Sequence, residues 1–201
     1  MTKLTHRLAG QLEALARTLR RYGRDDGKVL VLGGVRSGKS RHAERLVAHH
    51  SHLVYLAPGL PPGDDDPEWA ARVAAHQARR PAHWTTVETT DLATVLRSAT
   101  SPLLIDCLGT WLSRVLDEVG AWSGKAGWER RLDDRLEDFL AAWTQARVPV
   151  VAVSNEVGSG VVPATSSGRL FRDVLGALNN RVSAESDRSL LVVAGRVLEL
   201  P

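Results

Sequence analysis

The sequence has little cysteine, no long apolar run and no strong excess of either charge, and each shortage excludes a class of protein. Its one cysteine, Cys107, excludes a disulfide framework and a Cys-x-x-Cys metal site, and it suits a reducing compartment. No stretch approaches the roughly 18 apolar residues of a membrane span, and the first 20 residues lack the apolar core of a signal peptide. These shortages predict a cytoplasmic protein with no stable membrane insertion.

The charges nearly balance, with 26 Lys and Arg against 23 Asp and Glu. Residues 1–27 hold six bases and three acids, so residues 28–201 hold 20 of each sign and carry no net charge. Binding along a nucleic-acid backbone needs a basic excess, so a nucleic-acid partner is not expected for the main body. A hydrophobic content of 43% with 24% charged residues excludes an intrinsically disordered chain.

Residues 1–27 predict an N-terminal amphipathic helical extension. Leucines recur there at helical spacing, at positions Leu4, Leu8, Leu12, Leu15 and Leu19, and so share one stripe. We interpret this stripe as a surface that packs on the core or on another subunit. A membrane-surface helix and a targeting peptide remain the alternatives.

From residue 28 to 201, short apolar runs alternate with helical patterns. The strands are expected at 28–32, 53–57, 84–88, 103–106, 148–153, 190–193 and 197–200. The helices are expected at 38–50, 66–79, 91–98 and 170–187, with a long amphipathic segment over 108–146 that breaks near 120–127. This alternation predicts a single α/β domain, with a mainly parallel sheet and helices on both faces.

A phosphate-binding loop follows the first strand. Its eight residues fit the pattern G-x4-G-K-[ST]: Gly33, Gly34, Val35, Arg36, Ser37, Gly38, Lys39 and Ser40. Backbone N–H groups of such a loop hold phosphate oxygens, Lys39 would reach the β- and γ-phosphates, and Ser40 would ligate Mg2+. Asp106, at the end of the strand at 103–106, would orient Mg2+ or its water, unless it caps the next helix. The fold class expected is therefore P-loop NTPase-type, or RecA-like.

A second candidate site lies on the helix at 66–79. Arg72, His76 and Arg79 are spaced to share one face of this helix. Guanidinium groups beside an imidazole suit a polyphosphate, and the histidine could act as a general acid or base or as a nucleophile. A solvated basic helix face would have the same spacing, so spacing alone leaves both interpretations open.

Five blocks of the sequence together resemble one enzyme family. They are GGVRSGKSRHAE, RVAAHQARRPAHW, LLIDCLGTWLS, VSNEVGSGVVP and FRDVLGALNNRVS. In this order they resemble the bifunctional adenosylcobinamide kinase / adenosylcobinamide-phosphate guanylyltransferase family of cobalamin biosynthesis. The resemblance covers nearly all of residues 28–201. One departure is Ala75, where some relatives carry a second histidine, so His76 is the single candidate nucleophile.

The resemblance implies two reactions and a set of residues for them. ATP or GTP would phosphorylate adenosylcobinamide, and GMP would then pass from GTP through a covalent GMP–His76 to adenosylcobinamide phosphate, giving adenosylcobinamide-GDP and pyrophosphate. His76 and Lys39 would be catalytic, and Mg2+ would lie at Ser40 and Asp106. Beyond the phosphate loop, the implied nucleotide contacts are Leu56, Ala57, Pro58, Gln77, Ala78, Arg79, Arg80, Glu88 and Asp106. The resemblance also implies a cyclic homo-oligomer.

Two other functions remain open at this level. One is a monofunctional kinase in which His76 only clamps phosphate. The other is a nucleotide-binding regulatory protein whose leucine-striped helix docks on a partner or a membrane.

Overall fold

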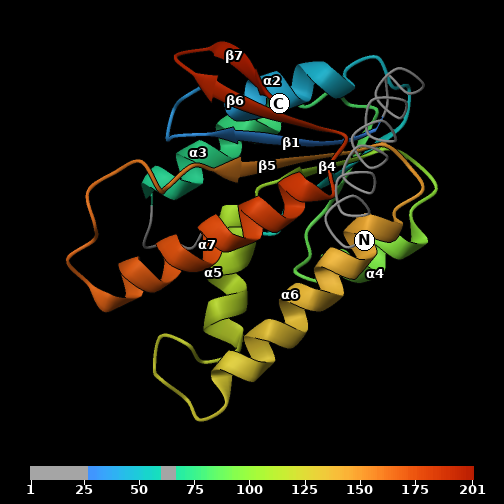
Figure 1. The fold of residues 1–201 in the computed structure, drawn as a ribbon. Helices are drawn as coiled ribbons and strands as arrows, with labels where there is room; N and C mark the ends of the chain where they lie inside the picture. The colour runs from blue at the N-terminus through green and yellow to red at the C-terminus, as the bar shows by residue number, and fades with distance from the viewer. Residues whose placement is uncertain (1–26, 60–66) are drawn as a thin grey trace, which may run out of the picture.

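In the computed structural model, which describes residues 27–59 and 67–201, the strands form one seven-stranded sheet in the order β3-β2-β4-β5-β1-β6-β7 (Figure 1). The strands are β1 (Lys28–Gly33), β2 (Leu53–Leu56), β3 (Trp84–Val87), β4 (Leu103–Asp106), β5 (Val150–Asn155), β6 (Arg188–Val193) and β7 (Arg196–Leu200). All neighbouring strands pair in parallel except β6 and β7, which form an antiparallel hairpin. The expected mainly parallel α/β sheet is confirmed.

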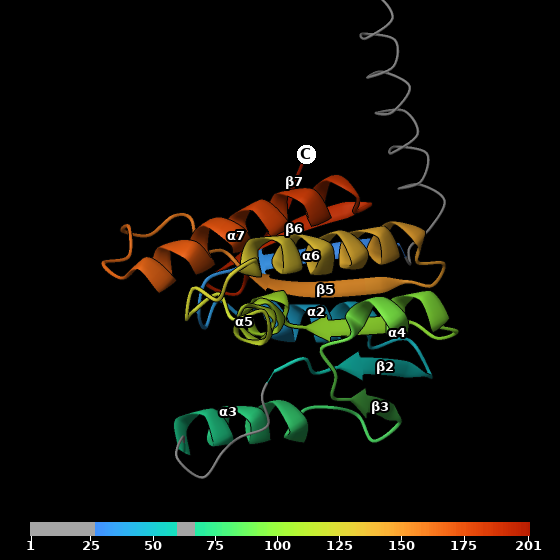
Figure 2. The same ribbon diagram turned by 90° about the horizontal axis from the view of Figure 1, so that it is seen from below.

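Helices cover both faces of this sheet. They are α2 (Lys39–Val47), α3 (Pro67–Ala78), α4 (Leu92–Ser98), α5 (Leu108–Glu118), α6 (Trp128–Gln145) and α7 (Ser166–Ala184). Alternate side chains of β1 separate the two cores: Val29 and Val31 pack on the α2 side, while Leu30 and Leu32 pack with α4 to α7. Figure 2 shows α4, α5, α6 and α7 together against the sheet. Because β1 is buried on both faces, its sequence reads as a continuous apolar run.

Several predicted boundaries differ from the structure; the helix predicted at 38–50, for example, is α2 at Lys39–Val47. The strand predicted at 148–153 is β5 at Val150–Asn155, because Pro149 has no N–H for the ladder and the pairing with β1 continues to Asn155, opposite Gly33. The helix predicted at 170–187 begins at Ser166, where the Thr165 hydroxyl accepts a hydrogen bond from the Gly168 amide at 3.2 Å. The predicted break near 120–127 is confirmed between α5 and α6.

The parallel strands bring the carboxyl ends of β1, β4 and β5 to one edge of the sheet. Gly33 at the end of β1 pairs with Asn155 of β5, and Asp106 of β4 pairs with Val153. The phosphate loop and Asp106 therefore lie at the carboxyl edge, where ligands bind in open α/β sheets. The helical extension predicted for residues 1–27, with its leucine stripe, lies outside the described residues; only Gly27 of that range is described. In the described ranges, none of the helices has the length and hydrophobicity needed to cross a membrane.

Candidate active site

Residues 33–40 form a tight turn between β1 and α2. Gly33 has no room for a side chain, because a Cβ there would lie 2.6 Å from the Val192 carbonyl oxygen. Gly38 has a φ of 95°, a conformation that glycine adopts without strain, and it is the N-cap of α2. The Ser37 carbonyl accepts a hydrogen bond from the Gly195 amide at 2.9 Å, which ties the loop to the β6–β7 turn. The loop is thus held at both ends, with the α2 N-terminus behind it.

Lys39 and Ser40 begin α2 and point to the carboxyl edge of the sheet. The Lys39 side chain is only 6% exposed, and its Nζ donates a hydrogen bond to the Gly34 carbonyl at 3.1 Å. The Ser40 hydroxyl donates to Asp106 Oδ1 at 3.3 Å. The structure therefore brings together the loop lysine, the loop hydroxyl and the strand-end acid, as the sequence predicted.

Asp106 collects three side chains on one carboxylate. Besides Ser40, the Tyr55 hydroxyl donates to Oδ2 at 2.8 Å, and His76 Nδ1 lies 3.4 Å from the same oxygen. Burial opposes ionisation of Asp106, but the hydrogen bond and charge of His76, with the two hydroxyl donors, outweigh it and lower the pKa of Asp106 below its usual value. Asp106 is therefore an anion that orients its neighbours. The cap of α5 is Cys107, so the capping alternative for Asp106 is wrong.

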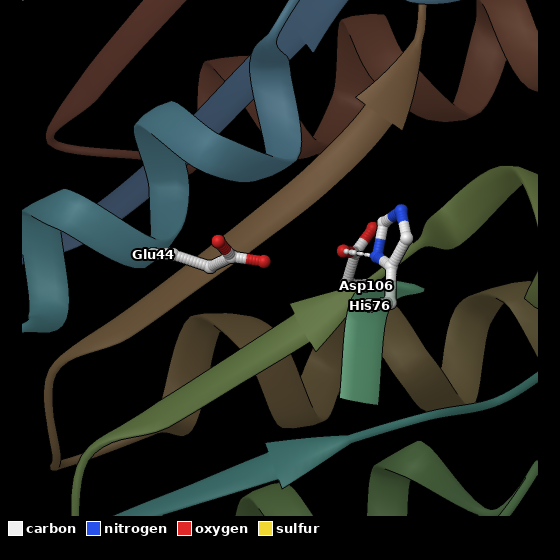
Figure 3. A group of neighbouring side chains, drawn as sticks. All are labelled: Glu44, His76 and Asp106. Atoms are coloured by element: carbon white, nitrogen blue, oxygen red, sulfur yellow. Dashed lines mark ion pairs between the residues drawn. The ribbon is translucent and has the colours of Figure 1, made fainter. Parts of the chain in front are cut away.

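His76 reaches this carboxylate from the last turn of α3 (Figure 3). Glu44 of α2 points toward the same place, and one ligand atom from each of Glu44, His76 and Asp106 lies within 4.8 Å of the others. Arg79 pairs with Glu44 at 3.1 Å and also donates to the Ala75 carbonyl. Arg79 therefore links the end of α3 to α2. Its guanidinium is paired with Glu44, whereas the sequence pattern had placed it beside His76 as a phosphate ligand.

Arg80 follows α3 and packs over a buried ring. Its guanidinium carbon lies 3.7 Å from the centroid of Tyr55, and one of its terminal nitrogens donates to the Thr86 hydroxyl at 3.3 Å. Among the described residues, its Nε atom is buried with no hydrogen-bond partner. An anionic ligand in the adjoining cavity would supply the missing acceptor.

A cavity of about 870 Å3 opens at this edge and contains most of these groups. Nine residues predicted for the site line it: Val35, Lys39, Ser40, Ala57, His76, Gln77, Arg80, Glu88 and Asp106. The other predicted residues lie outside its lining: Gly33, Gly34, Arg36, Ser37, Gly38, Leu56, Pro58, Ala78 and Arg79. Leu56 is fully buried, backbone included, so it offers no surface to a ligand. The side chain of Arg72 lies outside the described part of the structure.

Two site residues were missed by sequence reasoning. Glu44 lies four residues after Ser40, so the helical period placed it on the same face of α2. Tyr55 is a tyrosine inside an apolar strand, and its hydroxyl needs a partner when buried. Cys107 also lines the cavity, but burial and the Asp106 charge raise the pKa of its thiol, which disfavours the thiolate that a nucleophile would need.

The residues around Ser40 suit a hard divalent cation. A serine hydroxyl and a carboxylate held in its ionised form supply the oxygen ligands that Mg2+ prefers. The chemistry of this donor set is therefore compatible with the predicted Mg2+ position at Ser40 and Asp106.

The fold and the site together define a P-loop nucleotide-binding protein. A solved ATPase of a type III secretion system from pathogenic bacteria shares this fold, with a TM-score of 0.51 at 14% identity over 82% of this chain and 50% of that protein. Sequence comparison narrows the class. The chain belongs to the CobU family, described as cobinamide kinase / cobinamide phosphate guanyltransferase, whose model matches residues 29–200.

Curated relatives agree with this assignment over almost their whole length. The bifunctional adenosylcobalamin biosynthesis protein CobU of Salmonella typhimurium is 38% identical over 83% of this chain and 96% of its own. The Escherichia coli CobU is 35% identical over the same shares. The CobP protein of Pseudomonas aeruginosa is 38% identical over 85% of this chain and 95% of its own. The family resemblance stated from the motifs is confirmed.

Proposed function

We propose that this cobinamide kinase and guanylyltransferase carries out both of its reactions in the one cavity, around Lys39, His76 and Asp106. The observation that carries this proposal is the shared carboxylate: Asp106 contacts Ser40 of the phosphate loop at 3.3 Å and His76 at 3.4 Å. A phosphate group held by the loop would therefore lie beside the imidazole. One triphosphate site can then serve a transfer of the γ-phosphate and a transfer of GMP.

In the kinase reaction, the chain's part is to hold the triphosphate and neutralise its charge. Loop N–H groups and the α2 N-terminus would bind the phosphate oxygens, and Lys39 would exchange its contact with the Gly34 carbonyl for the β- and γ-phosphates. Ser40 and Asp106 would hold Mg2+, which supplies charge neutralisation when bound. Arg80, whose Nε atom has no acceptor within residues 27–59 and 67–201, would bind a further phosphate oxygen. The acceptor is the aminopropanol hydroxyl of adenosylcobinamide.

In the guanylyl transfer, Asp106 would set which nitrogen of His76 reacts. With the Nδ1 proton directed at Asp106 Oδ2, the lone pair is on Nε2, which is the nucleophile. The Nε2–phosphorus bond forms as the bond from the α-phosphorus to pyrophosphate breaks. The imidazole of the adduct is cationic, and the Asp106 anion stabilises it. A phosphate oxygen of adenosylcobinamide phosphate then displaces Nε2 and takes the GMP.

The remaining nucleotide contacts follow from the position of α3. The Arg79–Glu44 pair holds the last turn of α3 against α2, so that Gln77 and Arg80 line the same cavity as His76. Glu88 lines it from the segment after β3 and could accept hydrogen bonds from a guanine base. We therefore keep ATP and GTP as the nucleotides, with the backbone of the phosphate loop and the predicted residues that line the cavity as their contacts.

The assembly proposed is a cyclic homo-oligomer in the cytoplasm. Val161 and Val162 support it, because they are 95% and 63% exposed on the segment between β5 and α7. Neighbouring apolar side chains left in water favour burial against another surface.

The direct test is a product assay with purified protein. With adenosylcobinamide, ATP, GTP and Mg2+, we expect adenosylcobinamide phosphate first and adenosylcobinamide-GDP after it, resolved by chromatography and mass spectrometry. Phosphorylation without the second product, even when adenosylcobinamide phosphate is supplied, would favour the monofunctional kinase. Formation of neither product would favour the regulatory alternative.

A further inference from the structure

The cavity has a charged part and an uncharged part, and they come from different elements. Its charged side chains and its histidine belong to α2, α3, the residues after α3 and β3, and the end of β4. The lining side chains from α5, the segment after α5 and the first turns of α7 are all uncharged: Thr110, Ser113, Trp122, Ser167 and Phe171. We name these five residues the uncharged wall. Such a division fits a ligand with a phosphate at one end and a large neutral body at the other.

We propose that the uncharged wall binds the corrin body of the cobinamide acceptor and that Trp122 is its principal contact. This inference rests on the proposed function, because it takes adenosylcobinamide as the acceptor. A corrin presents a broad apolar face with neutral amide groups at its rim. Trp122 would cover that face, while hydroxyl groups of the wall such as Ser113 would bond with the amides.

Trp122 is a large aromatic side chain left 39% exposed on a well-fixed segment. Its neighbour Ala121 is buried, and the Ala121 amide bonds with the Leu116 carbonyl at 2.8 Å. Arg131 of α6 donates to the Val119 carbonyl at 2.7 Å and to the Ala126 carbonyl at 3.0 Å. The segment is therefore held on both sides of Trp122, so a ligand could bind the indole at little ordering cost.

The uncharged wall extends away from the phosphate site along α5. Gly109 and Thr110 line the cavity just after Asp106, and Ser113 lines it one turn further along α5. At 1.5 Å per residue, the 11 residues of α5 extend about 16 Å. The lining thus continues from the phosphate site along α5 to Trp122. A corrin on this wall could extend its aminopropanol arm back toward Lys39 and Asp106.

Phe171 completes the wall from α7. It is half-buried, because part of its ring packs on the core, and its remaining surface faces the cavity. Ser167 and Gly168 line the cavity one turn earlier on the same helix. The wall thus combines two large aromatic side chains with small residues, a composition that suits a wide, mainly apolar ligand.

The test separates corrin binding from nucleotide chemistry. Equilibrium dialysis, read by the visible absorbance of the corrin, would measure the Kd of adenosylcobinamide for the full-length wild type and for Trp122→Ala. We expect Kd to rise about tenfold or more in Trp122→Ala, as for a central aromatic contact, and to stay within about threefold of the wild type in Trp122→Phe. GMP labelling of the same Trp122→Ala protein by GTP and Mg2+ without corrinoid should persist, because that step needs no corrinoid.

Leu198→Ala is the control, because Leu198 is an exposed apolar residue on β7 outside the cavity lining. The Kd of adenosylcobinamide for this variant should equal that for the wild type. Phe171→Leu provides a second variant and should also weaken binding. An unchanged corrin Kd in folded Trp122→Ala would overturn the inference. So would a loss of GMP labelling equal to the loss of corrin binding, because the wall would then hold the nucleoside. Trp122-dependent corrin binding without turnover would uphold the inference and contradict the proposed function.

Discussion

At the scale of single residues, Asp106 has the most partners in the candidate site. Its carboxylate accepts hydrogen bonds from the hydroxyl groups of Ser40 and Tyr55 and lies beside His76 Nδ1. Removing Asp106 would leave these donors without their acceptor, and removing one donor would leave the buried carboxylate with too few hydrogen bonds. The proposed kinase and guanylyl-transfer steps would therefore depend on the same oxygen atoms.

Lys39 provides a prediction at this scale. Lys39→Ala should impair both half-reactions, because one phosphate loop would hold the triphosphate in each. The loss of a charge-assisted phosphate contact should cost about 2–4 kcal/mol of transition-state stabilisation, measured as kcat/KM for each reaction. Lys28→Ala is the matched control, since Lys28 lies at the opposite end of β1 and bonds with the Thr144 carbonyl. Near-normal rates in Lys39→Ala would mean that the loop does not bind the reacting phosphates.

The sequence was sufficient to predict some of these residues but not others. Gly33 to Ser40 were predictable because a local motif fixes their backbone, and Asp106 because it ends an apolar strand. The pairing of Arg79 with Glu44 was not, because it joins two helices whose residues lie 35 apart in the chain. Helical spacing alone placed Arg79 beside His76 and could not show which anion it meets.

At the scale of elements, the strand and helix types followed from periodicity, whereas some boundaries followed from tertiary contacts. β5 extends through Ser154 to Asn155 because both residues continue the parallel ladder with β1. The fully buried Ser154 hydroxyl donates a hydrogen bond to Asn179 of α7 at 2.6 Å. A polar residue at the end of an apolar run gives no sign of such a partner in the sequence. The same contact helps to position α7, which carries part of the uncharged wall.

The N-cap of α4 provides a prediction with a pH dependence. Asp91 Oδ1 accepts a hydrogen bond from the Thr94 amide at 3.1 Å, and the hydrogen bonding to Thr94 lowers the pKa of Asp91. Asp91→Ala should lower the free energy of unfolding by about 1 kcal/mol near neutral pH, as measured by urea denaturation. The folded state holds the carboxylate ionised more strongly than the unfolded state does. Its contribution is therefore present above the ordinary aspartate pKa and is lost as pH falls through the lower folded-state pKa.

The difference between wild type and Asp91→Ala should accordingly shrink in acid. Asp91→Asn is the control, because its side-chain oxygen still accepts the Thr94 amide, and it should stay close to the wild type at neutral pH. A difference between wild type and Asp91→Ala that does not change with pH would contradict the assigned role of the carboxylate charge.

At the scale of the whole molecule, the N-terminal extension should be dispensable for chemistry. Every described site residue lies after position 28, and helical spacing predicts that five leucines before it share one stripe. A chain that starts near Lys28, with Gly27 kept because its carbonyl accepts the Val150 amide, should still form GMP–His76. It should lose thermal stability or change its oligomeric state. The reason is that it would lose the burial of the five leucines, which stabilises by about 25 cal/mol per Å2 of apolar surface.

Thermal melting, native mass spectrometry and GMP labelling of the shortened chain would check this prediction. A loss of labelling would show that the extension takes part in the chemistry. An unchanged melting temperature and oligomer size, together with lost binding to lipid vesicles, would favour the membrane-surface interpretation.

The central claim is that one histidine beside the phosphate loop becomes covalently guanylylated, and intact-mass spectrometry tests it most directly. After incubation with GTP and Mg2+, the wild-type chain should gain the mass of one GMP, in an adduct that is labile in acid and stable in alkali. His76→Ala should gain nothing, whereas His83→Ala, which removes an exposed histidine seven residues later, should label like the wild type. An adduct that persists in His76→Ala would contradict the account.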